Sequence, residues 1–406
     1  KMYNYLLVFS LFTLLIVINE FLFYITFRRF LIKLTNSDVA VKILKILVIS
    51  IVFLFISCGL LRLRIPNYSF ISLTYNITCV LLVPKLFLFP FFLIINIFYL
   101  LKLLIYKFRK KSLPQNFSSK RRKFLSTLAW TGASLPILTA GVGLIYGVEN
   151  IKRRYYEISL LNFYSELDNF RIVHISDLHF GSFSSASAFQ KLCDIINFQL
   201  SPDMIFITGD FVNYCSEEIE PYFELLASLQ VRYKKFAILG NHDIAVGGEE
   251  IEKLLTDANI NVLRNSAFNM NTSAGIIQIV GVDFSLDENT NRKNLALAFD
   301  GINEELPCFF LCHNPELWDK FIASKYPADI TFAGHTHGGQ VTVPFTQQQI
   351  LPWEKVFNTD KIHGLYKQNY QYLYVNSGFG TTTLNVRIGT MPEVAIFDVK
   401  RTQHFI

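Results

Sequence analysis

Two histidines stand two residues apart in the stretch AGHTHGGQV, which runs from Ala333 to Val341. His335 and His337 have glycine and threonine as neighbours, so little side-chain bulk surrounds them. Neutral imidazole is a common ligand of transition metals, and glycine lets the main chain approach an ion or a phosphate closely. The stretch therefore raises the question of a site that holds metal ions.

Other polar groups follow apolar runs in the same half of the chain. They are Asp177 and His179 after RIVHIS, Asp210 after MIFIT, Asn241, His242 and Asp243 after KFAIL, and His313 after PCFFLC, while DITFA precedes His335 and His337. The first runs alternate with helical patterns, which predicts α/β layering with a largely parallel sheet. Later runs are separated by fewer helices and predict a second sheet packed on the first. Folds of this class bind ligands at the carboxyl ends of their strands.

The residue types at these strand ends indicate the chemistry of the site. Carboxylate and imidazole together suit Mn, Fe, Zn or Co, whereas no two of the six cysteines have the spacing of a structural zinc site. A carboxylate that bridges two ions needs uncrowded surroundings, and Asp210 after Gly209 is the candidate. Gly240, Gly334 and Gly338 are predicted to leave room for two divalent ions and a phosphate.

The motifs occur in the order DxH, GD, GNH, a lone His and GHxH, which resembles the signature of the calcineurin-like metallophosphoesterases from about Phe170 onward. GHTHGGQ, VNSGFGTTTLNVR and MPEV are similar to a membrane-associated group of bacterial phosphodiesterases, although TTTLNVR departs from the Gly-Leu-Pro type of sequence found before the arginine in that group. The resemblance implies a four-layer α/β/β/α sandwich. It assigns one metal to Asp177, His179, Asp210 and His337, and the other to Asp210, Asn241, His313 and His335.

Such a dinuclear site would use a bridging hydroxide that attacks phosphorus directly. His242 is predicted to protonate the leaving alkoxide without binding metal, with Asp243 orienting its ring. Arg387 lies near Ser377, Gly378 and Gly380 in the sequence. It is either a substrate-binding residue that contacts a phosphate oxygen or a surface arginine beside a turn.

The composition divides the chain into two parts. Hydrophobic residues make up 51% of the chain, with 39 Phe, and residues 1–149 are mostly Leu, Ile, Phe and Val. All eight histidines lie in residues 150–406. We expect a transmembrane helical region at 1–149 and a metallophosphoesterase domain at 150–406. Four spans are predicted near 5–27, 43–61, 76–106 and 124–147, with Lys85 and Pro90 interrupting the third.

Basic residues between the predicted spans indicate the topology. They collect in the first and third loops, so a multi-pass protein of the bacterial cell membrane with its domain on the extracytoplasmic face is expected. Arg121 and Arg122 in SKRRKFLS are either an internal twin-arginine export signal, which would engage that export machinery, or a basic stop-transfer flank. Because much of the net charge of +6 lies beside the spans, no nucleic-acid partner is expected.

The sequence favours a metal-dependent phosphodiesterase or diphosphatase. Tethering at a bilayer suggests a lipid-linked or cell-envelope phosphate substrate, while a soluble phosphoester in the periplasm fits the motifs equally well. The alternative is a membrane receptor or transporter-like protein whose outer domain binds a phosphorylated ligand without hydrolysis. Against this alternative, the spans show no paired ionisable residues of the kind that line a translocation path, and Glu20 is the only acid in the first three.

Overall fold

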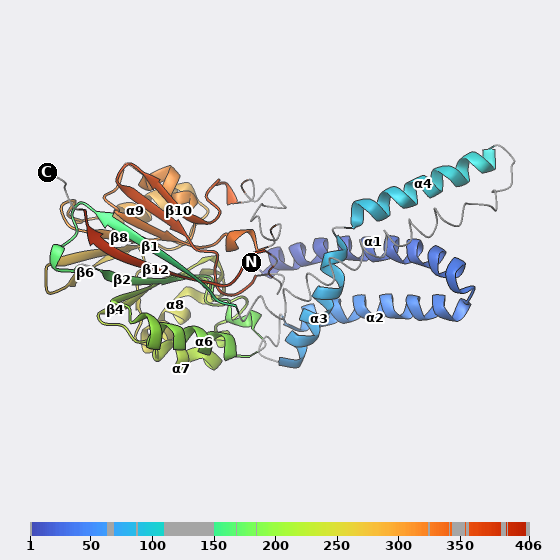
Figure 1. Ribbon diagram of the computed structural model, residues 1–406, viewed down its shortest axis with the longest axis horizontal. Helices are drawn as coiled ribbons and strands as arrows, with labels where there is room; N and C mark the ends of the chain where they lie inside the picture. The colour runs from blue at the N-terminus through green and yellow to red at the C-terminus, as the bar shows by residue number, and fades with distance from the viewer. Residues whose placement is uncertain are drawn as a thin grey trace. The chain divides into compact units, whose positions relative to one another are not determined.

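The computed structural model divides into two compact units, Lys1–Leu144 and Ile145–Ile406 (Figure 1). The residues that it describes are 2–62, 69–86, 88–108, 150–167, 169–183, 185–323, 325–340, 342, 354, 357–382, 387 and 389–402. The described part of the first unit is helical, whereas the second unit mixes helices with β-sheets.

Within its described part, the first unit consists of long helices. They are α1 (Met2–Thr35), α2 (Asp38–Arg62), α3 (Ser69–Leu86) and α4 (Phe89–Phe108). Three segments are long and apolar enough to cross a membrane, namely Phe9–Ile32, Asp38–Leu61 and Phe89–Phe108. These three helices support an association with a membrane.

The predicted third span does not form one continuous helix from 76 to 106. One helix ends at Leu86 and another begins at Phe89, with Pro90 in its first turn. Proline lacks the N–H that a helix interior needs, but it is well accepted in a first turn. The predicted fourth span near 124–147 and the Arg121–Arg122 pair lie outside the described residues.

An ion pair joins α1 to α3, contrary to the expectation that the spans hold no paired ionisable residues. Lys85 Nζ lies 3.0 Å from Glu20 Oε1, and both side chains are buried. Charged side chains in an apolar unit are costly unless they neutralise each other. Glu20, the buried acid of these described helices, thus links α1 to α3.

The second unit contains two six-stranded mixed sheets. The first has the order β1 (Lys152–Leu160), β12 (Glu393–Arg401), β2 (Phe170–Ile175), β3 (Met204–Thr208), β4 (Lys234–Ile238) and β5 (Asn261–Val262). Strands β2 to β5 run parallel, and β12 runs antiparallel to β2. The short apolar runs that were predicted as strands form the centre of this sheet, as expected for strands buried on both faces.

The second sheet has the order β10 (Gly364–Gln368), β11 (Gln371–Val375), β9 (Ile330–Ala333), β8 (Cys308–Leu311), β7 (Ile276–Gly281) and β6 (Ser266–Asn271). Its four central strands are parallel to one another, and β10 and β6 are antiparallel edges. Both sheets therefore have a parallel centre whose strands end at one edge, where ligands bind in folds of this class.

Helices accompany both sheets (Figure 1). The α-helices are α6 (Ser187–Ile195), α7 (Phe223–Ala227), α8 (Asn241–Asp257) and α9 (Glu288–Ala298). Short 3-10 or π turns are η1 (Ser165–Leu167), η2 (Phe180–Ser182), η3 (Ile196–Leu200), η4 (Ser216–Tyr222), η5 (Trp318–Ile322) and η6 (His337–Gly339).

Three hydrophobic clusters hold these elements together. Phe206 of β3 and Phe332 of β9 belong to a cluster built from both sheets, with ring centroids 5.1 Å apart. Ile205, the next residue along β3, belongs to a second cluster with α6, α7 and α8, and a third joins the second sheet to α9 and η5. Because successive strand residues point to opposite faces, one apolar run contributes side chains to two cores. A shift of the strand by one residue would exchange the two sets, so its register with the neighbouring strands is fixed.

Lys235 fixes the strand that leads to the GNH motif. Its side chain is buried, and Nζ donates to the carbonyls of Leu226, Ala227 and Ala258 at 3.0–3.2 Å. These carbonyls lie at the carboxyl ends of α7 and α8, where main-chain acceptors lack helical partners.

We predict that Lys235→Ala lowers the free energy of unfolding by about 3 kcal/mol, because three main-chain carbonyls lose a charged donor. Lys234→Ala, an exposed neighbour on the same strand, should change it by less than about 0.5 kcal/mol. The urea midpoint of each full-length variant in detergent, followed by near-ultraviolet circular dichroism, measures the difference. Equal midpoints for the two variants would contradict this role.

Candidate metal centre

The predicted site residues follow central strands of both sheets at one edge. Asp177 and His179 follow β2, Asp210 follows β3, Asn241 and His242 open α8 after β4, His313 follows β8, and His335 and His337 follow β9. The eight side chains are thus delivered by the ends of five strands, β2, β3 and β4 of one sheet and β8 and β9 of the other. Residues up to 160 positions apart meet because the parallel strand ends meet.

One group of donor atoms comes from Asp177, His179 and His337. Its ligand atoms all lie within 4.8 Å of one another. His337 Nε2 lies 3.2 Å from His179 Nε2 and 3.4 Å from Asp177 Oδ1. Two imidazole nitrogens and a carboxylate that face each other so closely can hold one divalent cation.

Asp210 connects this group to a second one. It forms a donor group with His313 and His335, and another with His179 and His242. Its Oδ2 lies 3.2 Å from His313 Nε2 and 3.5 Å from His179 Nε2. Asp210 is therefore the carboxylate that both sides of the site share.

Several buried atoms at this edge have no hydrogen-bond partner among the described residues, and they include Asn241 Oδ1, His313 Nε2 and His179 Nδ1. His313 Nδ1 donates to the Thr208 carbonyl at 2.7 Å, so the Nε2 lone pair of the neutral ring faces the Asp210 carboxylate. A cation must lie between such atoms, either a proton or a metal ion. These residues therefore fit a divalent metal.

Burial sets the protonation of the histidines. It lowers the pKa of His179 and of His335 to about 3, which keeps both rings neutral and ready to bind metal. Burial would also lower the pKa of His313, but the charge of Asp210 outweighs it and raises that pKa to about 9. Burial raises the pKa of Asp177 to about 6.

The main chain at the site is strained. Asp177, His179, Asp210, His335 and His337 have φ between 43° and 72°, in the left-handed region that L-residues avoid at a cost of about 1–2 kcal/mol each. Main-chain bonds fix this conformation, including those from His179 N to the Asp210 carbonyl and from Asp177 N to the Gly209 carbonyl. Such strain is concentrated at functional sites, where it aims side chains that a regular strand would turn away.

Two of the glycines that the sequence singled out pack directly against carboxylates of the site. A Cβ at Gly240 would lie 2.1 Å from Asp210 Oδ1, and one at Gly334 would lie 2.4 Å from Asp177 Oδ2. Both distances are far below a normal contact. Any side chain at these two positions would displace a carboxylate of the site.

The surroundings of His242 differ from the prediction. His242 Nδ1 lies 2.9 Å from the Asn213 carbonyl, which orients the ring and directs Nε2 away from that contact. Asp243 instead accepts the N–H groups of Gly240, Asp210, Phe211 and Val212, at 2.7–3.2 Å. Asp243 thereby holds the Asp210 loop against the start of α8. The sequence could not indicate this partner of His242, because every residue carries a main-chain carbonyl.

Arg387 is buried beneath the site. Its guanidinium donates to the carbonyls of Ser377 and Gly380, and Nη2 lies 3.4 Å from His337 Nδ1. Burial lowers its pKa to about 10, so it remains charged at neutral pH. Arg387 therefore contacts the main chain around Gly378 and the back of His337, and it is not the surface arginine that was one alternative.

Two polar residues support this region from positions that the sequence did not single out for a role. Glu393, in the MPEV stretch, accepts from Arg154 Nε, Ser377 Oγ and the Tyr374 hydroxyl and is fully buried. Gln340 exchanges two hydrogen bonds of 3.3 Å with the main chain of Thr382, which joins the GHTHGGQ loop to the segment that leads to Arg387. Both residues stabilise the region through hydrogen bonds between segments that are far apart in the sequence.

Comparisons with known proteins agree with this geometry. A family model described as calcineurin-like phosphoesterase matches residues 170–339. The metallophosphoesterase YkuE of Bacillus subtilis is 30% identical over 240 residues, covering 58% of this chain and 80% of that protein. The UDP-2,3-diacylglucosamine pyrophosphatase LpxG of Chlamydia muridarum is 30% identical over 295 residues, which cover 57% of this chain and 84% of that protein. The phosphodiesterase YaeI of Escherichia coli is 28% identical over 285 residues, which cover 69% of this chain and 98% of that protein.

Metal binding should release protons. At pH 7 the imidazole of His313 is protonated and must become neutral to bind a metal, so about one proton should leave. Below pH 6 the carboxyl of Asp177 is protonated as well, and a second proton must leave. Affinity for Mn²⁺ or Zn²⁺ should therefore fall increasingly steeply as the pH drops from 8 to 5.5. Metal titrations with simultaneous recording of proton release measure this, and binding independent of pH would contradict it.

Proposed function

This chain belongs to the calcineurin-like phosphoesterase family and is a phosphoester hydrolase, and we propose that it cleaves a diphosphate or phosphodiester linked to a lipid. The observation that carries the proposal is the position of Asp210, whose carboxylate is shared between donor groups on both sides of the site. A centre of this form suits the displacement of an alkoxide or phosphate at phosphorus.

We assign the metal ligands to two ions. Asp177, His179, Asp210 and His337 hold the first, and Asp210, Asn241, His313 and His335 hold the second. Asn241 Oδ1 and His313 Nε2 support the second set, since both are buried, have no hydrogen-bond partner among the described residues, and can offer an electron pair to a metal once His313 is neutral. The two sheets, with helices packed on their outer faces, support the four-layer α/β/β/α arrangement that carries these ligands.

When bound, two divalent ions would supply a shared hydroxide as nucleophile and neutralise the charge that develops on the phosphate oxygens. The contribution of the chain is to hold the ligands rigidly and to handle the proton of the leaving group. The Asn213 carbonyl accepts from His242 Nδ1, so a protonated His242 carries its other proton on Nε2, ready for a leaving oxygen. Arg387 and Asp243 are positioning residues in this account.

The substrate class follows from two observations. The described part of the first unit has three helices that are apolar and long enough to span a bilayer, so the hydrolase is expected to work at a membrane surface. The relative LpxG is named for a substrate in which a diphosphate links a nucleotide to an acylated sugar. We infer a multi-pass protein whose catalytic unit lies on the extracytoplasmic face and acts on a substrate of that kind.

Hydrolysis assays test the proposal. The full-length protein in vesicles, supplied with Mn²⁺ or Zn²⁺, should cleave UDP-2,3-diacylglucosamine at least tenfold more efficiently than a soluble aryl phosphodiester or an aryl phosphomonoester, and chelation should abolish turnover. His242→Ala should lower kcat about 10²- to 10⁴-fold, the range typical of a lost general acid, with bound metal unchanged.

Two outcomes would overturn parts of this proposal. Preferential cleavage of the soluble esters would exclude a lipid-linked substrate, although the hydrolytic centre would stand. Loss of metal from the His242→Ala protein, measured by elemental analysis, would make His242 a ligand instead of an acid.

A further inference from the structure

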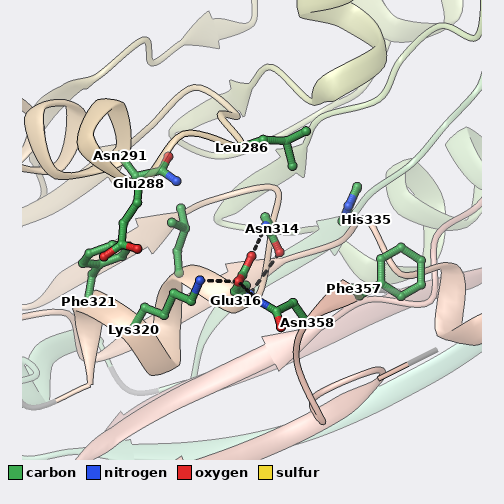
Figure 2. A pocket seen from close by; sticks show the side chains of 11 residues that line it. Leu286, Glu288, Asn291, Asn314, Glu316, Lys320, Phe321, His335, Phe357 and Asn358 are labelled. Atoms are coloured by element: carbon green, nitrogen blue, oxygen red, sulfur yellow. Dashed lines mark hydrogen bonds and ion pairs between the residues drawn. The ribbon is translucent and has the colours of Figure 1, made fainter. Parts of the chain in front are cut away.

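A cavity of about 280 Å³ begins at His335 and extends away from the metal centre. Three segments line it, namely Leu286–Asn291 at the start of α9, Asn314–Phe321 after β8, and Phe357–Asn358. Figure 2 shows His335 and Phe357 on one side and Glu288 and Phe321 on the opposite side. A group attached to a phosphate at the metal centre would therefore enter this cavity past His335.

The charged side chains that line the cavity are already paired. Lys320 Nζ lies 2.5 Å from Glu316 Oε1, and Glu316 also accepts from the amides of Asn314 and Asn358 (Figure 2). Glu288 pairs with Arg292 at 2.8 Å. Among the described lining residues, none offers an unpaired cation for a phosphate. A neutral occupant fits this lining better than an anionic one.

The remaining surface of the cavity is partly apolar and partly amide. Leu317, Phe321 and Phe357 supply apolar wall, and Asn291 and Asn314 supply amides. This combination suits a group that carries hydroxyls or amides on an otherwise apolar body. The volume of about 280 Å³ lies just below the range of about 300–1,000 Å³ for ligand pockets, which suits one sugar-sized group.

Leu286 stands at the rim and is 84% exposed. An exposed leucine beside a cavity is a surface on which an alkyl chain can lie as it leaves the pocket. A nucleobase would instead stack on an aromatic face. The Arg292 guanidinium already lies over the ring of Phe321, 4.9 Å from its centroid, and Phe357 is in edge-to-face contact with His335 at 5.2 Å. The rim and the wall thus both favour an acylated group over a base.

We propose that this cavity binds the sugar of an acylated sugar phosphate, with its acyl chain lying across Leu286, while the nucleoside lies elsewhere. The inference rests on the proposed function, since it places one end of a lipid-linked diphosphate at the centre described above. Leu286 and the segment up to Asn291 would then determine specificity without contact with the reacting atoms.

Kinetics with paired substrates test this assignment. The full-length protein is assayed with UDP-2,3-diacylglucosamine carrying short, water-soluble acyl chains and with UDP-glucosamine, and the ratio of the two kcat/KM values is compared between variants. Leu286→Ser should lower this ratio about tenfold, the loss expected when an alkyl group loses an apolar contact. Leu297→Ser is the matched control, because Leu297 lies on α9, is 66% exposed and does not line the cavity. It should keep the wild-type ratio.

A second pair of substrates keeps the acylated sugar and changes the nucleoside from uridine to adenosine. Leu286→Ser should leave that ratio unchanged, and a change there would put the nucleoside in the cavity and overturn the assignment. An unchanged acyl ratio in Leu286→Ser would overturn it as well, with the proposed function intact. If the wild type cleaves aryl esters but neither sugar diphosphate, both the lipid-linked substrate and the cavity assignment fall.

Discussion

The structure depends on one electrostatic constraint, the crowding of electron-pair donors around Asp210. Its carboxylate lies 3.2 Å from His313 Nε2 and 3.5 Å from His179 Nε2, in a site from which water is largely excluded. Without a cation these atoms would repel one another or stay unsatisfied. A proton or a divalent metal removes that cost, and the cluster of carboxylate and imidazole donors fits a divalent metal. Positive φ at five of its residues adds to the strain that the rest of the fold must hold.

The fold meets this constraint with rigid elements and buried polar anchors. Two sheets share an aromatic core through Phe206 and Phe332, which fixes the strand ends from which the ligands emerge. Asp243 binds four main-chain N–H groups around Asp210, and Arg387 binds main-chain carbonyls next to His337. Neither residue needs to touch a metal. They hold the proposed metal ligands close to one another, as partners behind the ligands of a preformed metal site do.

Much of the fold and of the site was predictable because the information is local. Apolar runs such as MIFIT are short, continuous and followed by ligand-type residues, so strands and strand-end sites could be read together. Contacts between residues far apart in the sequence could not be predicted in this way. The Asn213 carbonyl beside His242, the ion pair of Glu20 with Lys85, and the bonds of Arg387 join positions whose proximity only the folded chain creates. Pro90 indicated an interruption in the predicted third span. The sequence did not show that Pro90 itself lies inside the following helix, in its first turn.

The central claim is that one carboxylate, Asp210, bridges two metal ions. Electron paramagnetic resonance of the fully Mn²⁺-loaded protein tests it most directly, because two Mn²⁺ ions that share a carboxylate are magnetically coupled. The account predicts a coupled spectrum with hyperfine splitting about half that of isolated Mn²⁺, and two ions per chain. A six-line spectrum of isolated Mn²⁺ with one ion per chain would contradict it.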